Sequence, residues 1–251
     1  MKLTLRNKFL LPTLALVILG IAASIITTYV KSKNAIQDII QNNMSQIASL
    51  STNQLSSWLT QIKDEMYIWR EVDTYQTNLA YVNSGVTGYT TEISEQLAQE
   101  KSAKDYYEFI GITGPDGRVY FQSSDEIDDS LNVADKEFFK KAIKGETFIS
   151  DIYKSETSSK PVFVVACPMY GIDEFGFAST SEITGVFYGI VDFEYFATSY
   201  LNKINIGETS AGYVINKEGV VASHKDKSLV LTLDAHTLDF GKKMLEQKDG
   251  I

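Results

Sequence analysis

The segment 9–30 constrains this chain more than any other part of the sequence. It reads FLLPTLALVILGIAASIITTYV and contains no charged residue. A helix of this length, at about 1.5 Å per residue, spans roughly 33 Å and can cross a hydrocarbon core of about 30 Å. A cleaved signal peptide is the alternative, but its apolar core is usually only about 7–15 residues long. We therefore expect an uncleaved transmembrane helix at 9–30.

The charges beside this segment indicate its orientation. Lys2, Arg6 and Lys8 precede it, and no acidic residue occurs before residue 31. Because positively charged flanks stay on the cytoplasmic side, residues 1–8 are predicted to be cytoplasmic. The body of the chain then lies in the periplasm or outside the cell, anchored in the inner or plasma membrane.

The composition of the 251-residue chain argues against several classes of protein. Lys and Arg number 23 against 32 Asp and Glu, and this net charge of −9 disfavours a nucleic-acid-binding protein. A single cysteine, Cys167, excludes an intramolecular disulfide framework and a cysteine-rich zinc site. Two histidines exclude a multi-histidine metal centre. We expect no cofactor and no metal.

A helical periodicity continues after the apolar segment. Apolar residues recur mostly every three or four positions from Ile36 to Trp69, and neither Pro nor Gly occurs between Gly20 and Gly85. The pattern predicts one long amphipathic helix over 31–82, which could act as a stalk, pack along its own domain, or do both. The same apolar stripe could pair two copies of the chain, so we expect a homodimer through this helix.

The apolar pattern then changes to alternation, which is typical of strands. A turn at 83–90 and a short helix at 91–104 precede the change. The predicted strands lie near 106–113, 117–124, 146–153, 161–170 and 183–192, and further helices lie near 135–144 and 193–204. The sequence therefore predicts an α/β (α+β) fold with an antiparallel sheet.

A short internal repeat follows. AGYVINKEGVVASH at 211–224 resembles FIGITGPDGRVYFQS at 109–123, and each reads as a strand, a polar turn that ends in glycine, and a second strand. After the second copy only a helical stretch near 234–248 remains, which is too little for a stable sheet domain. Either this second unit takes strands from elsewhere or the chain is a fragment of a longer product, and we expect the latter.

No motif in the sequence predicts catalysis. Ser223, His224 and Asp226 are close in sequence, but neighbours on a strand point to opposite faces, so we interpret them as a polar strand end. The acidic loop 125–129 lacks the glycine that a calcium loop needs and is interpreted as a solvated loop. Cys167 lies in the apolar run VFVVACP and is expected in the core. We therefore predict no enzyme, but a protein that binds a molecule outside the cytoplasm and reports it inside.

An ordered set of segments carries a family resemblance. The basic N-terminus, the apolar helix and the long helix are followed by ITGPDGRVYFQSS, ADKEFFKKAIKGETFISDIY, KPVFVVACPMY and GVFYGIVDFEYFATSYLNKINIGETSAGYVINKEGVVASHKDKSLV. This set resembles the double-Cache (tandem PAS-like) sensor domain of bacterial methyl-accepting chemotaxis receptors, and the resemblance covers nearly the whole chain.

The resemblance implies two PAS-like units along the long helix. The distal unit, at 83–205, would hold a small-molecule ligand, and the proximal unit would begin at 206–251. The ligand would shift a helix and so pass a signal across the membrane, with chemotaxis as the expected output. A sensor of a histidine kinase or of a diguanylate cyclase is the alternative. Many members of the family are homodimers.

The amino-acid-binding members of this family have a pattern that can be matched residue by residue. Their arginine, which binds the ligand carboxylate, falls on Lys136, and their aromatic pair falls on Phe138 and Phe139. Their tyrosine falls on Tyr153, and the nearby aspartate falls on Ser155. The cation is thus retained as a lysine, which lacks the bidentate fork of arginine.

The aspartate that binds the ligand ammonium in those members falls on Ile190. Asp192 lies two positions further on, on the same face of the predicted strand. An α-amino acid is therefore disfavoured, and one cation with apolar walls suits a small organic acid. The resemblance implies a ligand site made of Lys136, Phe138, Phe139, Phe121, Tyr153, Ser155 and Asp192.

Other interpretations remain open at this point. Lys136 could be a solvated helix residue, and because Phe138 and Phe139 are adjacent on a helix, at least one of them is expected in the core. The whole chain could instead be an anchored module without a ligand, which dimerises or docks a partner through the stripe from Ile36 to Trp69. A membrane-anchored enzyme is a third hypothesis, which no set of residues supports.

Overall fold

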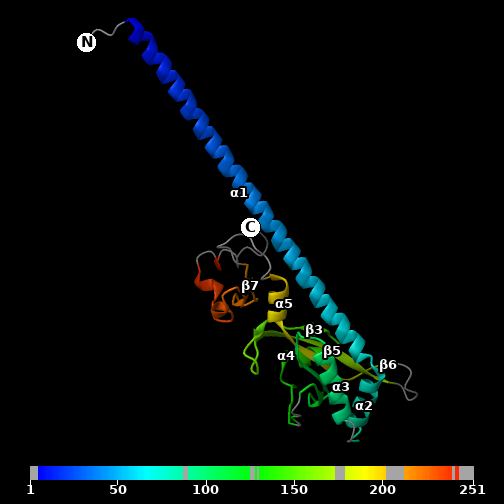
Figure 1. Cartoon of the computed structure of the whole chain (residues 1–251). Coiled ribbons are helices and arrows are strands. Elements are labelled where there is room, and N and C mark those ends of the chain that lie inside the picture. Colours follow the sequence, from blue (N-terminus) through cyan, green and yellow to red (C-terminus); the bar gives the residue numbers. More distant parts are fainter. Residues whose placement is uncertain are drawn as a thin grey trace. The chain divides into compact units, whose positions relative to one another are not determined.

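The computed structural model describes residues 5–86, 90–124, 128, 130–172, 179–201, 212–238 and 241–242. The chain divides into two compact units, residues 1–50 and residues 51–250. Helix α1 (Leu5–Arg70) contributes its first part to one unit and its last part to the other (Figure 1).

The first unit consists of the N-terminal part of α1. From Pro12 onward this helix is long and apolar enough to cross a membrane, and it is the one such helix in the described part of the chain. Most of the predicted membrane segment 9–30 falls within it. Its apolar side chains are exposed, and Leu16 and Ile25 have 70% and 63% of their surface accessible. A helix that is apolar all round and has no protein packed on it suits a lipid environment.

The second unit is built on an antiparallel sheet of six strands. Its helices are the end of α1, α2 (Asp73–Asn83), α3 (Thr90–Ser102), α4 (Glu137–Ala142) and α5 (Phe193–Ser199). The strands of the sheet are β1 (Tyr107–Thr113), β2 (Val119–Gln122), β3 (Phe148–Ile149), β4 (Tyr153–Lys154), β5 (Pro161–Ile172) and β6 (Ser179–Asp192). They lie in the order β2-β1-β6-β5-β3, and β4 also pairs with β5. The predicted α+β fold with an antiparallel sheet is confirmed.

The strand β5 is central because of its sequence. It reads PVFVVACPMYGI, and its first nine residues are all buried. A strand without polar alternation suits a sheet that is covered on both faces. It pairs with β6 over ten positions, with Cys167 opposite Phe187. The predicted core position of Cys167 is confirmed, since this side chain has no exposed surface.

One face of the sheet packs against α1, α2 and α3. Trp58, Ile62, Met66 and Trp69 of α1 enter this core, and none of them is more than 7% exposed. The sheet contributes large apolar side chains, including Phe121 and Phe187, which have no exposed surface. The last part of α1 is therefore a core helix of the second unit.

The apolar stripe of α1 thus divides into two parts. From Trp58 it is buried against the sheet, whereas Ile36, Ile40, Met44 and Leu50 in the first unit are between 45% and 62% exposed. The prediction that this helix packs along its own domain is confirmed for the part after Leu55.

The opposite face of the sheet carries a second core under α4. Its buried members are Val119, Val133, Phe139, Ala142, Val164, Ala166, Val186 and Tyr188. Side chains at its edge are only half-buried, among them Phe109, Phe138 and Ile190. This face is therefore less completely closed than the face that α1 covers.

The repeat predicted from the sequence is confirmed by its hydrogen bonds. The hairpin of β7 (Val214–Ile215) and β8 (Val221–Ser223) contains Gly219, whose φ of +82° matches the +81° of Gly117 in the first copy. The carbonyl of Gly117 accepts a hydrogen bond from the amide of Val133, and the carbonyl of Gly219 accepts one from Ala235. The chain therefore begins a second copy of the same structural unit.

The long helix predicted over 31–82 is interrupted. The helix α1 ends at Arg70, and α2 begins at Asp73. The guanidinium of Arg70 lies 5.4 Å from the ring centroid of Tyr170, and the side chain of Gln76 donates to the Arg70 carbonyl. These contacts accompany a break in the helix at which the local sequence contains neither Pro nor Gly.

Three further predicted elements differ in extent. The strand expected at 146–153 is replaced by β3 and β4, because Ser150 leaves the ladder and accepts a hydrogen bond from Val164 through its hydroxyl. The helix expected at 193–204 ends at Ser199. In the stretch 234–248, the structure has a short 3-10 helix at Ala235–Thr237, and residues 243–248 lie outside the described residues.

A buried carboxylate ties α1 to the start of the sheet. Glu65 accepts hydrogen bonds from the Tyr106 hydroxyl at 2.7 Å and from the Tyr107 hydroxyl at 3.1 Å. The ammonium of Lys104 lies 3.0 Å from the same carboxylate. Burial alone would raise the pKa of Glu65, but the hydrogen bonds from Gln61, Tyr106 and Lys104 outweigh it, so this pKa lies below its usual value.

We predict that Glu65→Gln destabilises the protein by about 1–3 kcal/mol at pH 7, because two phenols and one ammonium lose their charged acceptor. Since the pKa of Glu65 is lower in the folded chain, its contribution is complete above the unfolded value near 4.5 and is lost as the pH falls through the folded value. Urea unfolding of both proteins at pH 7 and below pH 4 tests this. A difference that stays constant with pH would contradict it.

Candidate functional site

Tyr188 of β6 lies at the centre of the sheet face under α4. It is 2% exposed, and its ring centroid lies 4.9 Å from that of Phe138 and 5.6 Å from that of Phe109. Burial raises the pKa of its phenol, and Tyr153 adds to this effect, so the phenol is neutral. Its hydroxyl makes no hydrogen bond to any described residue. A phenol without a hydrogen-bond partner in the described part of the protein is a candidate donor to a ligand.

Tyr153 of β4 adds a second phenol to the same face. It pairs with Val162 of β5 and is 41% exposed. Burial, together with the charges of Glu108 and Glu156, raises its pKa to about 12, so this phenol is also a neutral donor. We call the group of Phe109, Phe138, Tyr153, Tyr188 and Ile190 the aromatic face.

A polar network closes one end of this face. Glu108 of β1 accepts hydrogen bonds from the hydroxyls of Ser155 and Ser158, which lie in the turn between β4 and β5. The hydroxyl of Ser155 also accepts from the backbone amides of Thr157 and Ser158. Ser155 is 5% exposed, and its hydrogen bonds are all used to hold this turn.

Asp192 is likewise engaged within the protein. One of its oxygens accepts from the backbone amide of Glu194 at 2.8 Å, which caps α5. The other accepts from the ammonium of Lys160 at 2.7 Å. The hydrogen bond to Asp192 raises the pKa of Lys160 above its usual value, against the opposing effect of burial. Neither oxygen of Asp192 is therefore free for a ligand ammonium.

The three predicted residues at α4 have different surroundings. Lys136 is exposed and occupies the position just before the helix, where its backbone is extended. Phe138 is half-buried on the aromatic face, whereas Phe139 is 5% exposed and belongs to the second core. The two adjacent phenylalanines therefore point in different directions, as helix geometry predicts.

The prediction that Phe121 belongs to this site is wrong. Phe121 has no exposed surface and lies in the core against α1, on the opposite face of the sheet. The cause is a bulge in β2: Ile112 pairs with Phe121, but Thr113 pairs with Val119, so Tyr120 has no partner in the ladder. One extra residue reverses the face to which the following side chains point.

The structure thus brings together Phe138 and Tyr153, places Lys136 beside α4, and commits Ser155 and Asp192 to internal hydrogen bonds. The sequence analysis missed Tyr188 and Phe109. A signal for Tyr188 was present, because it alternates with Ile190 and Asp192 along one strand. No such signal existed for Phe109, because a register shift between Tyr107 and Phe109 interrupts the alternation.

The arrangement suits binding better than bond-making chemistry. The aromatic face offers ring surfaces and two neutral phenols, and the exposed Lys136 directly precedes α4 in the sequence. In the sequence 223–226, Nδ1 of His224 accepts from the amide of Asp226 at 2.9 Å, so this histidine orders its own loop and not a nucleophile. Among the described residues there is no group of three or more His, Cys, Asp or Glu that could hold a metal ion.

Comparisons with known proteins agree with the α+β fold described above. Residues 32–250 match the profile of a family described as Cache domain. No curated protein sequence is significantly similar to the chain. The sensor domain of the V. cholerae histidine kinase DctB is similar in structure, with a TM-score of 0.60 and 14% identity, over 86% of this chain and 80% of that chain.

Two chemoreceptor structures are similar as well. The ligand-binding domain of Campylobacter jejuni Tlp3, in complex with 4-methylisoleucine, has a TM-score of 0.59 and 13% identity, over 78% of this chain and 74% of that chain. The ligand-binding domain of the Pseudomonas aeruginosa amino acid chemoreceptor PctC, in complex with GABA, has a TM-score of 0.51 and 15% identity, over 79% and 82%. At these identities the likeness establishes a shared fold.

The two faces predict different costs for two similar substitutions. Phe121→Ala removes a fully buried ring from the core under α1 and should destabilise the protein by about 3–5 kcal/mol. Phe138→Ala truncates a half-buried ring at the edge of the aromatic face and should cost only about 1 kcal/mol. Chemical unfolding of the two variants measures both values. Equal costs would show that the two rings share one environment.

Proposed function

Since this chain belongs to the Cache domain family, we propose that its body is the extracytoplasmic sensor part of a transmembrane receptor that binds a small molecule on the aromatic face. The observation that carries the proposal is the hydroxyl of Tyr188, which lacks a partner among the described residues and belongs to a ring that packs on both Phe109 and Phe138. A ligand with a hydrogen-bond acceptor would satisfy it.

The proposed ligand is a small organic acid. Lys136, two positions before Phe138, supplies a cation for a carboxylate, while the aromatic rings supply apolar walls. An α-amino acid is disfavoured, because the aspartate that would bind its ammonium is replaced by Ile190, and Asp192 is engaged by Lys160. The 4-methylisoleucine and GABA in two structures of similar fold also carry a carboxylate, which supports an acid as the ligand.

The proposed signal path is α1 itself. Ile62 and Met66 of this helix are fully buried against the sheet, and the apolar segment 9–30 lies in the same unbroken helix. A ligand that changes the sheet would displace this packed helix, because close-packed side chains transmit small shifts. With residues 1–8 in the cytoplasm, the displacement would reach the inner side of the membrane. We assign the output to chemotaxis, with a histidine kinase or diguanylate cyclase as the alternative, and no catalytic step to the sensor part.

A dimer is the second element of the proposal. Ile36, Ile40, Met44 and Leu50 form an exposed apolar stripe at helical spacing on α1. An apolar stripe of this kind on an exposed helix suits pairing with the same stripe of a second copy. The chain could then act as a dimerising anchored module even without a ligand.

The ligand proposal is tested on the whole chain in nanodiscs, with thermal unfolding as the readout. L-lactate and succinate serve as acids, and L-leucine serves as the α-amino acid. We expect at least one of the acids to raise the unfolding temperature, and L-leucine to have no effect. Lys136→Gln should weaken acid binding about tenfold, because a charge-assisted hydrogen bond is lost.

Two further variants make this test specific. Lys144→Gln removes an exposed lysine just after α4 and should leave binding unchanged. Tyr188→Phe removes only the phenolic hydroxyl. It should weaken acid binding without lowering the unfolding temperature of the ligand-free chain. Acid binding that survives both Lys136→Gln and Tyr188→Phe would contradict the proposed site.

The dimer is tested by substitution on the stripe. Ile40→Asp should shift the whole chain in detergent from dimer to monomer, because a charge in an apolar helix contact is left without a partner. Gln41→Asp places the same charge one position away, off the stripe, and should leave the dimer intact. Light scattering gives both masses. A dimer that persists in Ile40→Asp would show that this stripe does not form the contact.

A further inference from the structure

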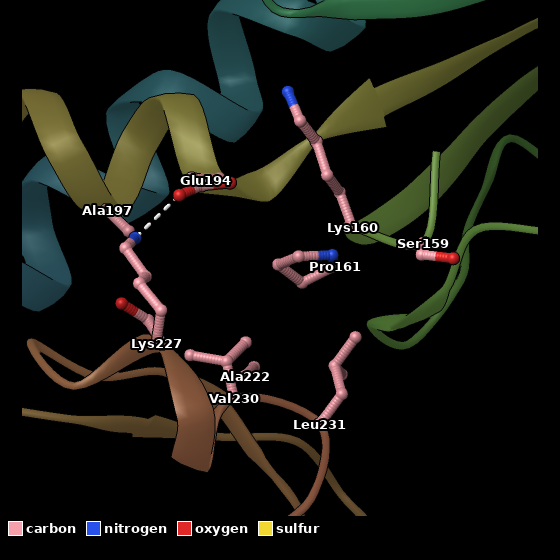
Figure 2. A pocket seen from close by; sticks show the side chains of 10 residues that line it. Ser159, Lys160, Pro161, Glu194, Ala197, Ala222, Lys227, Val230 and Leu231 are labelled. Carbon is pink, nitrogen blue, oxygen red and sulfur yellow. Dashed lines mark ion pairs between the residues drawn. The ribbon is translucent and has the colours of Figure 1, made fainter. Parts of the chain in front are cut away.

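A cavity of about 190 Å³ lies away from the aromatic face. Three segments of the second unit surround it: the turn between β4 and β5, the helix α5, and the strand β8 with the chain that follows it (Figure 2). It therefore lies where the sheet meets the second copy of the hairpin unit. Its volume is below the roughly 300–1,000 Å³ that is usual for drug-sized ligands, so an occupant must be compact.

The backbone around this cavity is held in an unusual conformation. Ser159 and Leu231 both line it, and they are the two described non-glycine residues with positive φ, at 61° and 58°. L-amino acids seldom adopt this conformation, and leucine does so especially rarely. Such residues persist where the surrounding structure requires them, and they are concentrated at binding sites.

The residues that line the cavity include apolar side chains and one hydroxyl. Pro161, Ala222 and Val230 contribute apolar surface (Figure 2). Ser223 also lines the cavity, and its hydroxyl makes no hydrogen bond to any described residue. This hydroxyl can therefore donate to a ligand in the cavity.

One cation in the wall is placed to bind an anion. Lys160, Lys227 and Glu194 line the cavity. Lys160 is engaged by Asp192 at 2.7 Å, and its side chain extends away from Pro161 (Figure 2). Lys227 lies 2.6 Å from Glu194, and its side chain remains 52% exposed. Since an ammonium has three donors, Lys227 can bind a second carboxylate beside Glu194.

We propose that this cavity is a second binding site, for a short-chain aliphatic carboxylate. The carboxylate would lie on the ammonium of Lys227 and the hydroxyl of Ser223, and the aliphatic chain would lie against Pro161, Ala222 and Val230. This site is separate from the aromatic face and does not depend on ligand binding there. Its occupant would contact both α5 and the hairpin formed by β7 and β8.

The test titrates sodium propionate into the whole chain in detergent, with saturation-transfer NMR as the readout. Propionamide, which has the same shape and no charge, is the control compound. We expect saturable binding of propionate and at least tenfold weaker binding of propionamide, because the amide cannot form a charge-assisted pair with Lys227. Equal affinities, or no saturable binding of propionate, would overturn the proposal.

Three variants locate the binding. Lys227→Met should raise the Kd about tenfold or more, because it removes the cation. Glu194→Gln should lower the Kd about two- to fivefold, because it frees Lys227 from its half-exposed partner. Lys217→Met, at an exposed lysine of the same hairpin, should leave the Kd unchanged.

One outcome of the variant measurements would contradict the proposal. A Kd that does not respond to Lys227→Met would overturn the proposal and assign propionate to another surface. The gain of affinity in Glu194→Gln is the strongest arm, because a variant that merely unfolds loses binding and cannot gain it. Thermal unfolding of each variant confirms that the chain is folded.

Discussion

The packing of α1 on the sheet is the contact on which the rest of this structure depends. Ile62 and Met66 have no exposed surface, and burying an aliphatic side chain of this size contributes about 1.5–3 kcal/mol. Trp58 and Trp69 extend the same buried face. Because the helix runs unbroken from Leu5 to Arg70, the element that completes the core is also the element that contains the membrane-length apolar segment. A change in the packing of the sheet would therefore act directly on the buried end of α1.

The two faces of the sheet differ in the helices that cover them. The face under α1 is closed by large apolar side chains, and the partly buried carboxylate of Glu65 there accepts hydrogen bonds from two phenols. The face under the short helix α4 leaves Phe138 half-buried and the hydroxyl of Tyr188 without a described partner. On this second face the proposed ligand would meet aromatic rings and a phenol that can donate to it.

The sequence predicted those parts of the fold that depend on local pattern. The apolar runs of β5 and β6 and the glycine turns of the two hairpins were recognisable, because burial on both faces and positive φ leave direct traces in residue type. The end of α1 was not predictable, because no Pro or Gly marks it in the sequence. Phe138 lies on the same face of the sheet as Tyr188, whereas a bulge turns Phe121 to the other face. Nothing in the local sequence reveals that Lys160 engages Asp192.

The same polar network separates and connects the two candidate sites. Glu108 holds the turn between β4 and β5 through Ser155 and Ser158, and the next residue of that turn, Ser159, lines the cavity beside α5 with its left-handed backbone. Lys160 follows directly and is bound to Asp192, which caps α5. Movement of β1 at the aromatic face would therefore be felt at the cavity through one short turn, without a change in the core. The two proposed sites are thus linked through hydrogen bonds at one edge of the sheet, outside its close-packed core.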